Sequence, residues 1–244
     1  MSDLALFCLL LVAIACGFFL GQRRGRRSAS SEKSVGLSQG YFKGLNYLLN
    51  EQADSAVDKF IETLEVNAET LETHLALGNL MRRKGEVDRA IKVHQNLLAR
   101  PSLNTQQLHH AQLELARDFI KAGLLDRAEG LLQELVESSN TLKNTSLELL
   151  VGIYRDEGEW EKAIHAVNLI VGRRWAKFPP QWGVVQAHFC CELAEIALDQ
   201  NDYLSARRYL KQGLGYDRDS VRTSLLWGNL EFRLGRYKEA LKIL

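Results

Sequence analysis

The histidines are the side chains in this sequence best suited to proton transfer or metal binding, and their spacing argues against both. His109 and His110 are adjacent, so on a helix they point about 100° apart and chelate one ion poorly. The remaining four fall where packing within a helical repeat explains them: His74, His94, His165 and His188. No phosphate-binding loop, nucleophile elbow or paired-carboxylate arrangement occurs. We therefore expect no catalytic residue and no enzyme activity.

The four cysteines also lack the spacing of a chemical site. Cys8, Cys16, Cys190 and Cys191 form no disulfide framework and no C-x-x-C metal pair, which favours a reducing compartment for the body of the chain. We expect no metal site in these 244 residues. For the adjacent pair Cys190 and Cys191, core packing and a reactive thiol are the two interpretations.

Binding chemistry has a stronger basis. A set of mostly basic and amide side chains falls on one face of the predicted first helices of the repeats defined below: Asn79, Arg82, Arg83, His110, Arg117, Lys121, Arg155 and Asn229. Such a groove would suit an acidic peptide segment. Carboxylates fall on the same face: Glu148, Asp156, Glu195 and Asp199. The alternative is an ordinary solvated face whose charges contact only water.

Six regularly spaced alanines define the elements that carry these side chains. Each follows a short turn, as in G-E-V-D-R-A at 85–90 and G-E-W-E-K-A at 158–163, and successive alanines lie 34, 38, 35, 43 and 34 residues apart. A period near 34 with this signature is typical of the tetratricopeptide repeat, a helix–turn–helix unit. The predicted fold class is all-α: a right-handed superhelical solenoid of such repeats, preceded by one N-terminal transmembrane helix.

The repeat at 71–104 shows why the pattern predicts packed helix pairs. Leu77 and Gly78 stand where the first helix approaches the second, Gly85 would end the first helix in the left-handed conformation, and Ala90 is small enough for close helix contact. About six repeats are expected, near 37–70, 71–104, 109–142, 144–177, 187–220 and 221–244. The last is incomplete and lacks a polar cap, so we expect the natural protein to continue.

The two longest gaps, of 38 and 43 residues, predict insertions around 100–105 and within 172–183. The second segment reads G-R-R-W-A-K-F-P-P-Q-W-G, and its prolines Pro179 and Pro180 should exclude a helix. Its aromatic residues Trp175, Phe178 and Trp182 would make a protruding contact loop. A packed connector that covers a seam between repeats is the alternative.

The N-terminus predicts a membrane anchor. Residues 4–20 contain no charge and just reach the length of a spanning helix. The basic residues follow this apolar run, at Arg23, Arg24, Arg26 and Arg27, which favours an anchor at 1–21 and a juxtamembrane tether at 22–36. A single pass would place the N-terminus outside and the repeats in the cytoplasm, with anionic lipid at the basic flank. A cleaved signal or a lipoprotein signal ending at Cys16 is the alternative.

Specific segments resemble one family. H-L-A-L-G-N-L-M-R-R-K-G-E-V-D-R-A-I-K-V-H-Q at 74–95 resembles the second repeat of the lipopolysaccharide assembly protein B (LapB, YciM) family of Gram-negative bacteria. A-H-F-C-C-E-L-A at 187–194, Y-x-x-G-x-N-x-L-L at 41–49 and C-G-F-F-L-G-Q-R-R at 16–24 agree with it. The resemblance covers the chain from the predicted anchor to the sixth repeat.

The resemblance implies an adaptor at the bacterial inner membrane, with its N-terminus in the periplasm. Family members bring the deacetylase LpxC to the membrane protease FtsH, which restrains lipopolysaccharide synthesis, and the inner-membrane regulator LapC (YejM) opposes them. They also carry a C-terminal rubredoxin-like iron or zinc module with two C-x-x-C pairs, which is absent from these residues. A non-proteolytic scaffold for lipopolysaccharide synthesis and transport proteins is the alternative. Self-association stays open, and a net charge of +1 gives no case for nucleic acid.

Overall fold

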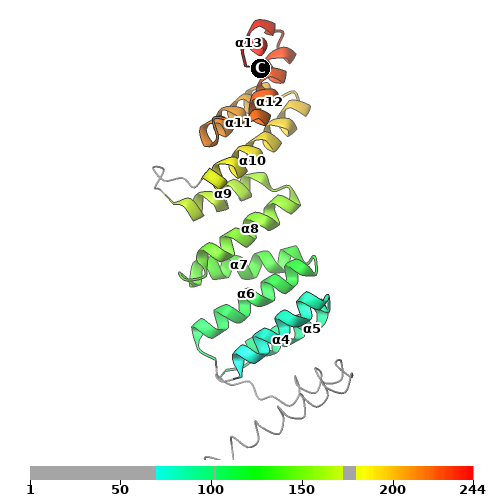
Figure 1. The fold of residues 1–244 in the computed structure, drawn as a ribbon, viewed down its shortest axis with the longest axis vertical. Coiled ribbons are helices and arrows are strands. Elements are labelled where there is room, and N and C mark those ends of the chain that lie inside the picture. The colour runs from blue at the N-terminus through cyan, green and yellow to red at the C-terminus, as the bar shows by residue number, and fades with distance from the viewer. Residues whose placement is uncertain (1–69, 102, 173–179, 244) are drawn as a thin grey trace, which may run out of the picture. The chain divides into compact units, whose positions relative to one another are not determined.

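The structure, a computed structural model, describes residues 70–101, 103–172 and 180–243 (Figure 1). The chain divides into two compact units, Met1–His74 and Leu75–Leu244, and nearly all described residues belong to the second. The predicted anchor at 1–21, the tether at 22–36 and almost all of the first repeat lie outside the described residues. Within the described ranges, no helix combines the length and apolar character needed to cross a membrane.

The described residues are almost all helical, which confirms the predicted all-α class. Their bounds, in chain order, are α4 (Leu71–Lys84), α5 (Val87–Leu98), α6 (Thr105–Lys121), α7 (Leu125–Ser138), α8 (Lys143–Glu157), α9 (Trp160–Val171), α10 (Pro180–Asp199), α11 (Tyr203–Tyr216), α12 (Val221–Arg233) and α13 (Tyr237–Ile243). From α5 to α13 each helix packs against the next, and α10 also contacts α12 (Figure 1). The helices of the second unit therefore stack in chain order.

The turn inside each helix pair depends on one left-handed residue. Gly85, Gly123, Gly158 and Gly235 have φ between 73° and 87°, and in the pair α10–α11 Asn201 takes the same place with φ 59°. Glycine adopts this conformation without a Cβ clash, and asparagine is among the few other residues that tolerate it. The predicted role of Gly85 is confirmed.

The alanine that follows each turn lies at the contact between paired helices. Ala90, Ala128, Ala163 and Ala206 are fully buried, and Ala240 is nearly so. A small side chain there lets the two helices approach closely. The regular spacing of the alanines thus corresponds to the spacing of helix contacts in the structure.

The core runs as a seam through the stack. One buried cluster joins α6 to α9 and reaches α10 through Phe189 and Cys190. A second joins α10, α11 and α12 around Leu198, Leu210 and Leu230. Successive helices of the stack thus share apolar contacts, as expected for a repeat protein whose units bury their faces against neighbours.

Two helices begin earlier than their predicted repeats. α6 begins at Thr105 because Asn104 and Gln107 form a reciprocal capping box, with the Asn104 side chain accepting from the Gln107 N–H and the Gln107 side chain accepting from the Asn104 N–H. α10 begins at Pro180, so the expectation that this proline excludes a helix was wrong. Proline is tolerated at the first helical position, where its missing N–H would have no helical partner. Longer first helices thus account for part of both insertions.

Candidate protein-binding surfaces

The predicted basic face contains an arginine that is already occupied within the chain. Arg82 on α4 donates to Asp118 Oδ1 and Glu114 Oε2 on α6, both at 2.7 Å. It also donates to Asn79 Oδ1 at 2.6 Å. Burial opposes the charge of Arg82, but its hydrogen bonds and ion pairs with Glu114 and Asp118 outweigh that effect and raise its pKa. Arg82 therefore joins successive repeats.

The two carboxylates extend this network. Glu114 also accepts from Arg117 at 2.6 Å, and the fully buried Asp118 contacts Nδ1 of the fully buried His94 on α5 at 2.5 Å. We define the charge network as Asn79, Arg82, His94, Glu114, Arg117 and Asp118. It brings together three of the predicted site residues, Asn79, Arg82 and Arg117. Glu114 and Asp118 were not among the predicted site residues, although their spacing of four residues places them on one side of a helix.

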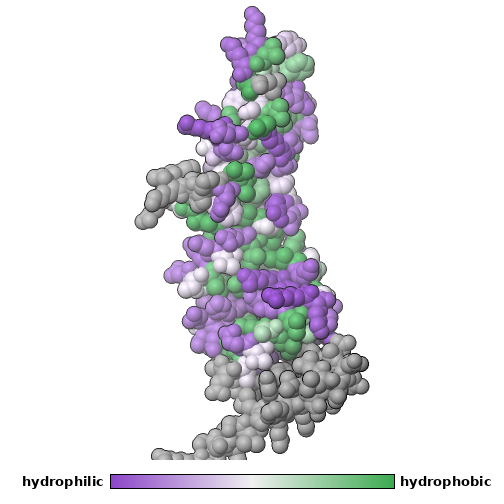
Figure 2. All heavy atoms as spheres, in the orientation of Figure 1, coloured by the Kyte–Doolittle hydropathy of each residue, from purple (hydrophilic) through white to green (hydrophobic). Residues whose placement is uncertain are grey.

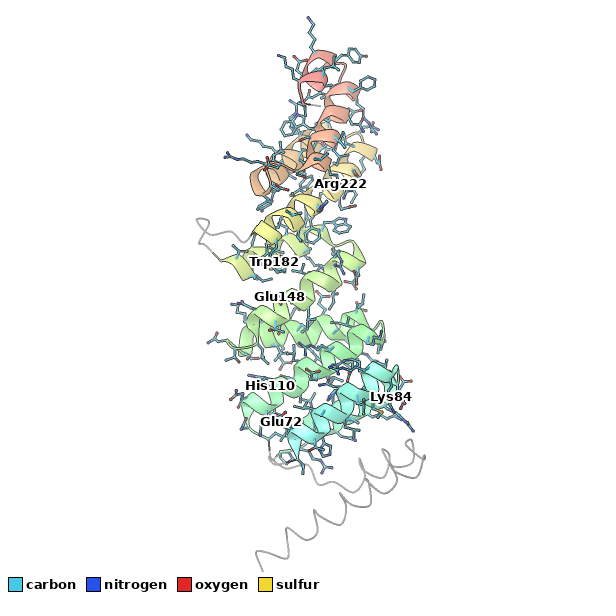
Figure 3. All side chains as sticks on the ribbon, viewed as in Figure 1. Glu72, Lys84, His110, Glu148, Trp182 and Arg222 are labelled. Carbon is cyan, nitrogen blue, oxygen red and sulfur yellow. The ribbon has the colours of Figure 1, made fainter. Side chains whose placement is uncertain are left out.

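The other predicted face residues are exposed. Arg83, His110, Lys121, Arg155 and Asn229 are all open to solvent, and Figure 3 labels His110 on α6. Arg155 pairs with its neighbour Asp156 at 2.9 Å. Among the described residues no ion pair involves Arg83 or Lys121. These two cations keep their charge available to a partner.

Acidic members of the same face are partly engaged as well. Arg222 on α12 donates to Glu192 at 2.7 Å and to Glu195 at 2.9 Å on α10. Burial works against its charge, but the two glutamates raise the pKa of Arg222. Figure 3 shows Arg222 on α12 and Glu148 on α8, and Glu148 is exposed. The face therefore alternates between internal ion pairs and free charges rather than forming one basic stripe.

The last residues of the predicted contact loop, from 180 onward, are helical. Trp182 lies on α10 (Figure 3), where it is partly buried and packs against the core. This placement corrects the prediction that Trp182 belongs to a loop and fits the packed alternative for that residue. Trp175 and Phe178 lie outside the described residues, as do the flank arginines Arg23, Arg24, Arg26 and Arg27.

A separate pocket of about 610 Å³ opens between α7, α8 and α9. We call it the α7–α9 pocket. Its lining is Glu129, Gln133, Val136, Glu137, Leu147, Leu150, Tyr154, Glu161, Lys162, His165, Ala166 and Leu169. The repeat pattern predicted that His165 and His188 are packed, but both are exposed. In Figure 2, hydrophobic residues reach the surface between polar ones along the middle of the stack.

Tyr154 organises one side of the α7–α9 pocket. Its hydroxyl donates to Glu129 Oε1 at 2.9 Å and accepts from Gln133 Nε2 at 3.2 Å. Lys162 lies 5.4 Å from the centre of the Tyr154 ring. Burial raises the pKa of Tyr154, the hydrogen bond with Gln133 lowers it in part, and the Glu129 carboxylate raises it further, so the neutral hydroxyl acts as a donor at physiological pH.

A second, more apolar hollow lies between α12 and α13. Its volume is about 440 Å³, and its lining includes the exposed residues Leu225, Phe232, Tyr237 and Leu241. Phe232 and Tyr237 meet edge to face, with ring centres 5.3 Å apart. This face offers apolar contact area but few polar groups.

The metal-ligating and thiol side chains of the described residues were the other candidates for a chemical site. No group of three or more histidine, cysteine, aspartate or glutamate side chains is placed to hold a metal ion within the described ranges. Cys190 and Cys191 are fully buried, and burial raises the pKa of Cys190 to about 12. Burial also raises the pKa of Cys191, whose sulfur lies 3.3 Å from the Thr223 hydroxyl. Both thiols therefore pack in the core.

Comparison with known proteins agrees with the helical repeats. Models described as tetratricopeptide repeats match residues 73–107 and 191–244. Lipopolysaccharide assembly protein B of Escherichia coli strain K12 is 39% identical over 240 residues, which cover 98% of this chain and 60% of that protein. Over these 240 residues the chain is similar to lipopolysaccharide assembly protein B, and two of its segments match tetratricopeptide-repeat models.

Further relatives carry the same name. The Haemophilus influenzae strain Rd protein is 37% identical over 98% of this chain and 61% of its own length. The chain thus spans about three-fifths of the curated relatives it matches.

Among solved structures, one of MamA from Desulfovibrio magneticus aligns with 73% of this chain and 93% of the MamA chain. The sequence identity is 10% and the TM-score is 0.45.

Proposed function

We propose that this chain restrains lipopolysaccharide synthesis as a membrane-held adaptor that presents the deacetylase LpxC to the protease FtsH. The observation that carries the proposal is the match to lipopolysaccharide assembly protein B over 98% of the chain. The described residues add a physical reason for binding rather than catalysis. A stack of helix pairs offers an extended surface, and within the described ranges no metal cluster and no reactive thiol accompany it.

The predicted anchor would give the adaptor its place of action. Residues 1–21 would hold the repeats beside the inner membrane, and Arg23, Arg24, Arg26 and Arg27 would rest on anionic lipid. Tethering raises the effective concentration of the adaptor at a membrane protease without any new contact. The regulator LapC (YejM) would act through this membrane region. An iron or zinc rubredoxin-like site remains an expectation for a module outside these residues.

The predicted face on the first helices of the repeats, here called the first-helix face, has two cations without an ion pair among the described residues, Arg83 and Lys121. These two are the best placed to bind an acidic partner segment. Arg83 and Lys121 are exposed, whereas Arg82 and Arg117 already hold Glu114. A partner carboxylate would have to displace an internal ion pair to reach Arg82. We therefore assign partner contact to Arg83 and Lys121, with His110 alongside, rather than to the whole predicted set.

The test is deacetylase binding by the full chain in lipid nanodiscs, measured by biolayer interferometry. The double variant Arg83→Glu, Lys121→Glu should weaken binding about tenfold or more, because two attractive charges become repulsive. The matched control Lys92→Glu, Lys211→Glu reverses two exposed lysines on second helices and should stay within about twofold. An equal loss of deacetylase binding in the double variant and its control would mean that the first-helix face is an ordinary solvated surface. Deacetylase binding without protease binding would instead favour the non-proteolytic scaffold.

A further inference from the structure

We propose that the α7–α9 pocket binds a protein segment in which an apolar side chain lies next to lysine or arginine. The pocket uses α7 and α9, the second helices of their pairs, together with the side of α8 that faces them. It shares no residue with Arg83, His110 or Lys121 of the first-helix face. The inference does not depend on the lipopolysaccharide role.

The floor of the pocket is apolar and incompletely covered. Leu147 and Leu150 form its buried base, while Leu169 on α9 is 43% exposed. An exposed leucine beside a hollow loses contact with water when an apolar side chain covers it, and this burial is favourable. A volume of about 610 Å³ holds one or two large side chains and lies within the usual range of binding pockets.

The rim of the pocket carries an excess of negative charge. Glu129, Glu137 and Glu161 oppose the single ammonium of Lys162, which leaves a net formal charge of −2 with His165 neutral. The ammonium is itself engaged, because it lies over the Tyr154 ring and 3.9 Å from Glu159. The charge that faces an incoming segment is therefore mainly carboxylate.

Two of these carboxylates are held in place and still have a free oxygen. Tyr154 and Gln133 both bond to Oε1 of Glu129, and the Tyr209 hydroxyl donates to Oε1 of Glu161 at 2.9 Å. No hydrogen bond to the second oxygen of either carboxylate occurs among the described residues, and none to the Glu137 carboxylate. Side chains fixed before binding lose less conformational entropy on binding, so the rim is prepared for a cationic donor.

These features select one class of partner. An apolar side chain would fill the space above Leu147 and Leu150, and a flanking ammonium or guanidinium would reach Glu137 or the open oxygens of Glu129 and Glu161. An acidic segment would meet repulsion at the rim, and an uncharged apolar one would leave the carboxylates without new partners. The segment recognised is thus basic and amphipathic.

The experiment is selection from a phage library of random 12-residue peptides on the full chain in phosphatidylcholine nanodiscs, with empty nanodiscs for counter-selection. Two variants are selected in parallel: Leu169→Ser alters the floor, and Glu137→Lys with Glu161→Lys reverses the rim. Their matched controls are Leu204→Ser and Glu134→Lys, exposed residues on α11 and α7 outside the pocket. Circular dichroism would check that each variant keeps its helix content.

We expect peptides that pair Leu, Phe or Met with Lys or Arg to be enriched on the wild type and both controls and lost on both pocket variants. By fluorescence anisotropy, the most enriched peptide should bind each pocket variant at least tenfold more weakly than its control. Enrichment of acidic or uncharged peptides would overturn the proposal. So would binding that the pocket variants and their controls change equally.

Discussion

Gly78 and His94 show how a single missing Cβ sets a contact between helices. A Cβ on Gly78 would lie 2.4 Å from Nε2 of His94, closer than any real contact, and His94 is fully buried against Asp118. The imidazole therefore occupies space that only glycine leaves open. The repeat pattern predicted Gly78 at the helix contact, but a sequence does not show which residue of α5 fills the space.

Replacing Gly78 with alanine should destabilise the fold by about 2 kcal/mol, because His94 must move and its bond to Asp118 is strained or lost. Gly130 on helix α7 is the matched control, since a Cβ added there meets nothing within 4 Å. Gly130→Ala should stabilise by up to about 1 kcal/mol. Urea unfolding followed by circular dichroism measures both. If Gly78→Ala did not lower the free energy of unfolding relative to Gly130→Ala, this packing would be contradicted.

The reactivity of the adjacent cysteines Cys190 and Cys191 tests whether these side chains are buried. Cys190 and Cys191 are fully buried, and burial raises the pKa of both thiols, to about 12 for Cys190, so the neutral thiol, a poor nucleophile, predominates at pH 8. We expect iodoacetamide to leave Cys190 and Cys191 unmodified in the folded chain and to label both in urea. Peptide mass spectrometry gives the readout. Labelling of the folded chain at the rate of free glutathione would show an accessible, reactive thiol.

Helix pairs are joined to one another by ion pairs as well as by apolar packing. Arg82 links α4 to α6, Arg222 links α12 to α10, and Arg207 links α11 to Glu231 on α12 at 2.5 Å. Each carboxylate comes from the neighbouring repeat. Charges that looked like a binding stripe in the sequence therefore serve in part to hold successive repeats together.

Asp118→Asn should cost about 3 kcal/mol of stability, because it removes the buried charge opposite Arg82 and weakens the contact with His94. Asp126→Asn, at an exposed position in the first turn of α7, is the control and should change stability by less than about 0.5 kcal/mol. Thermal unfolding of the two variants distinguishes the buried network from a surface pair. Equal midpoints would mean that Asp118 contributes nothing beyond an ordinary surface charge.

The elements that sequence analysis predicted best are those fixed by local chemistry. The turn glycines and the alanines after them follow from the conformational freedom of glycine and the need for close helix contact, so the helix pairs could be recognised. The capping box at Asn104 and Gln107 was not among the predictions, although the asparagine and the glutamine stand three residues apart in the sequence. Pro180 misled because proline breaks a helix interior but suits its first position.

The surfaces were harder to predict because they depend on neighbouring helices. The partners of Arg82 come from 32 and 36 residues away, and the α7–α9 pocket needs three helices to exist. His165 was expected to pack, yet in the structure it is exposed at that pocket. Helical periodicity assigns a residue to a face, but only the packed stack shows whether a charge there is free.

At the scale of the whole molecule, the proposed adaptor combines a membrane anchor with an extended binding surface. The anchor is the predicted segment 1–21, and the surface is formed by the helices from α4 to α13. Neither part requires catalytic residues. The stability of the repeats and the affinity for partners should therefore be separable, with Gly78 and Asp118 governing the first and Arg83 and Lys121 the second.

The half-life of the deacetylase LpxC in cells with and without the gene for this chain tests the proposed function most directly. It would be measured by immunoblotting after protein synthesis is stopped, in the bacterium that encodes the chain. The adaptor account predicts a deacetylase half-life several-fold longer in the disrupted strain, restored by the wild-type gene and not by Arg83→Glu with Lys121→Glu. An unchanged half-life in the disrupted strain would contradict it.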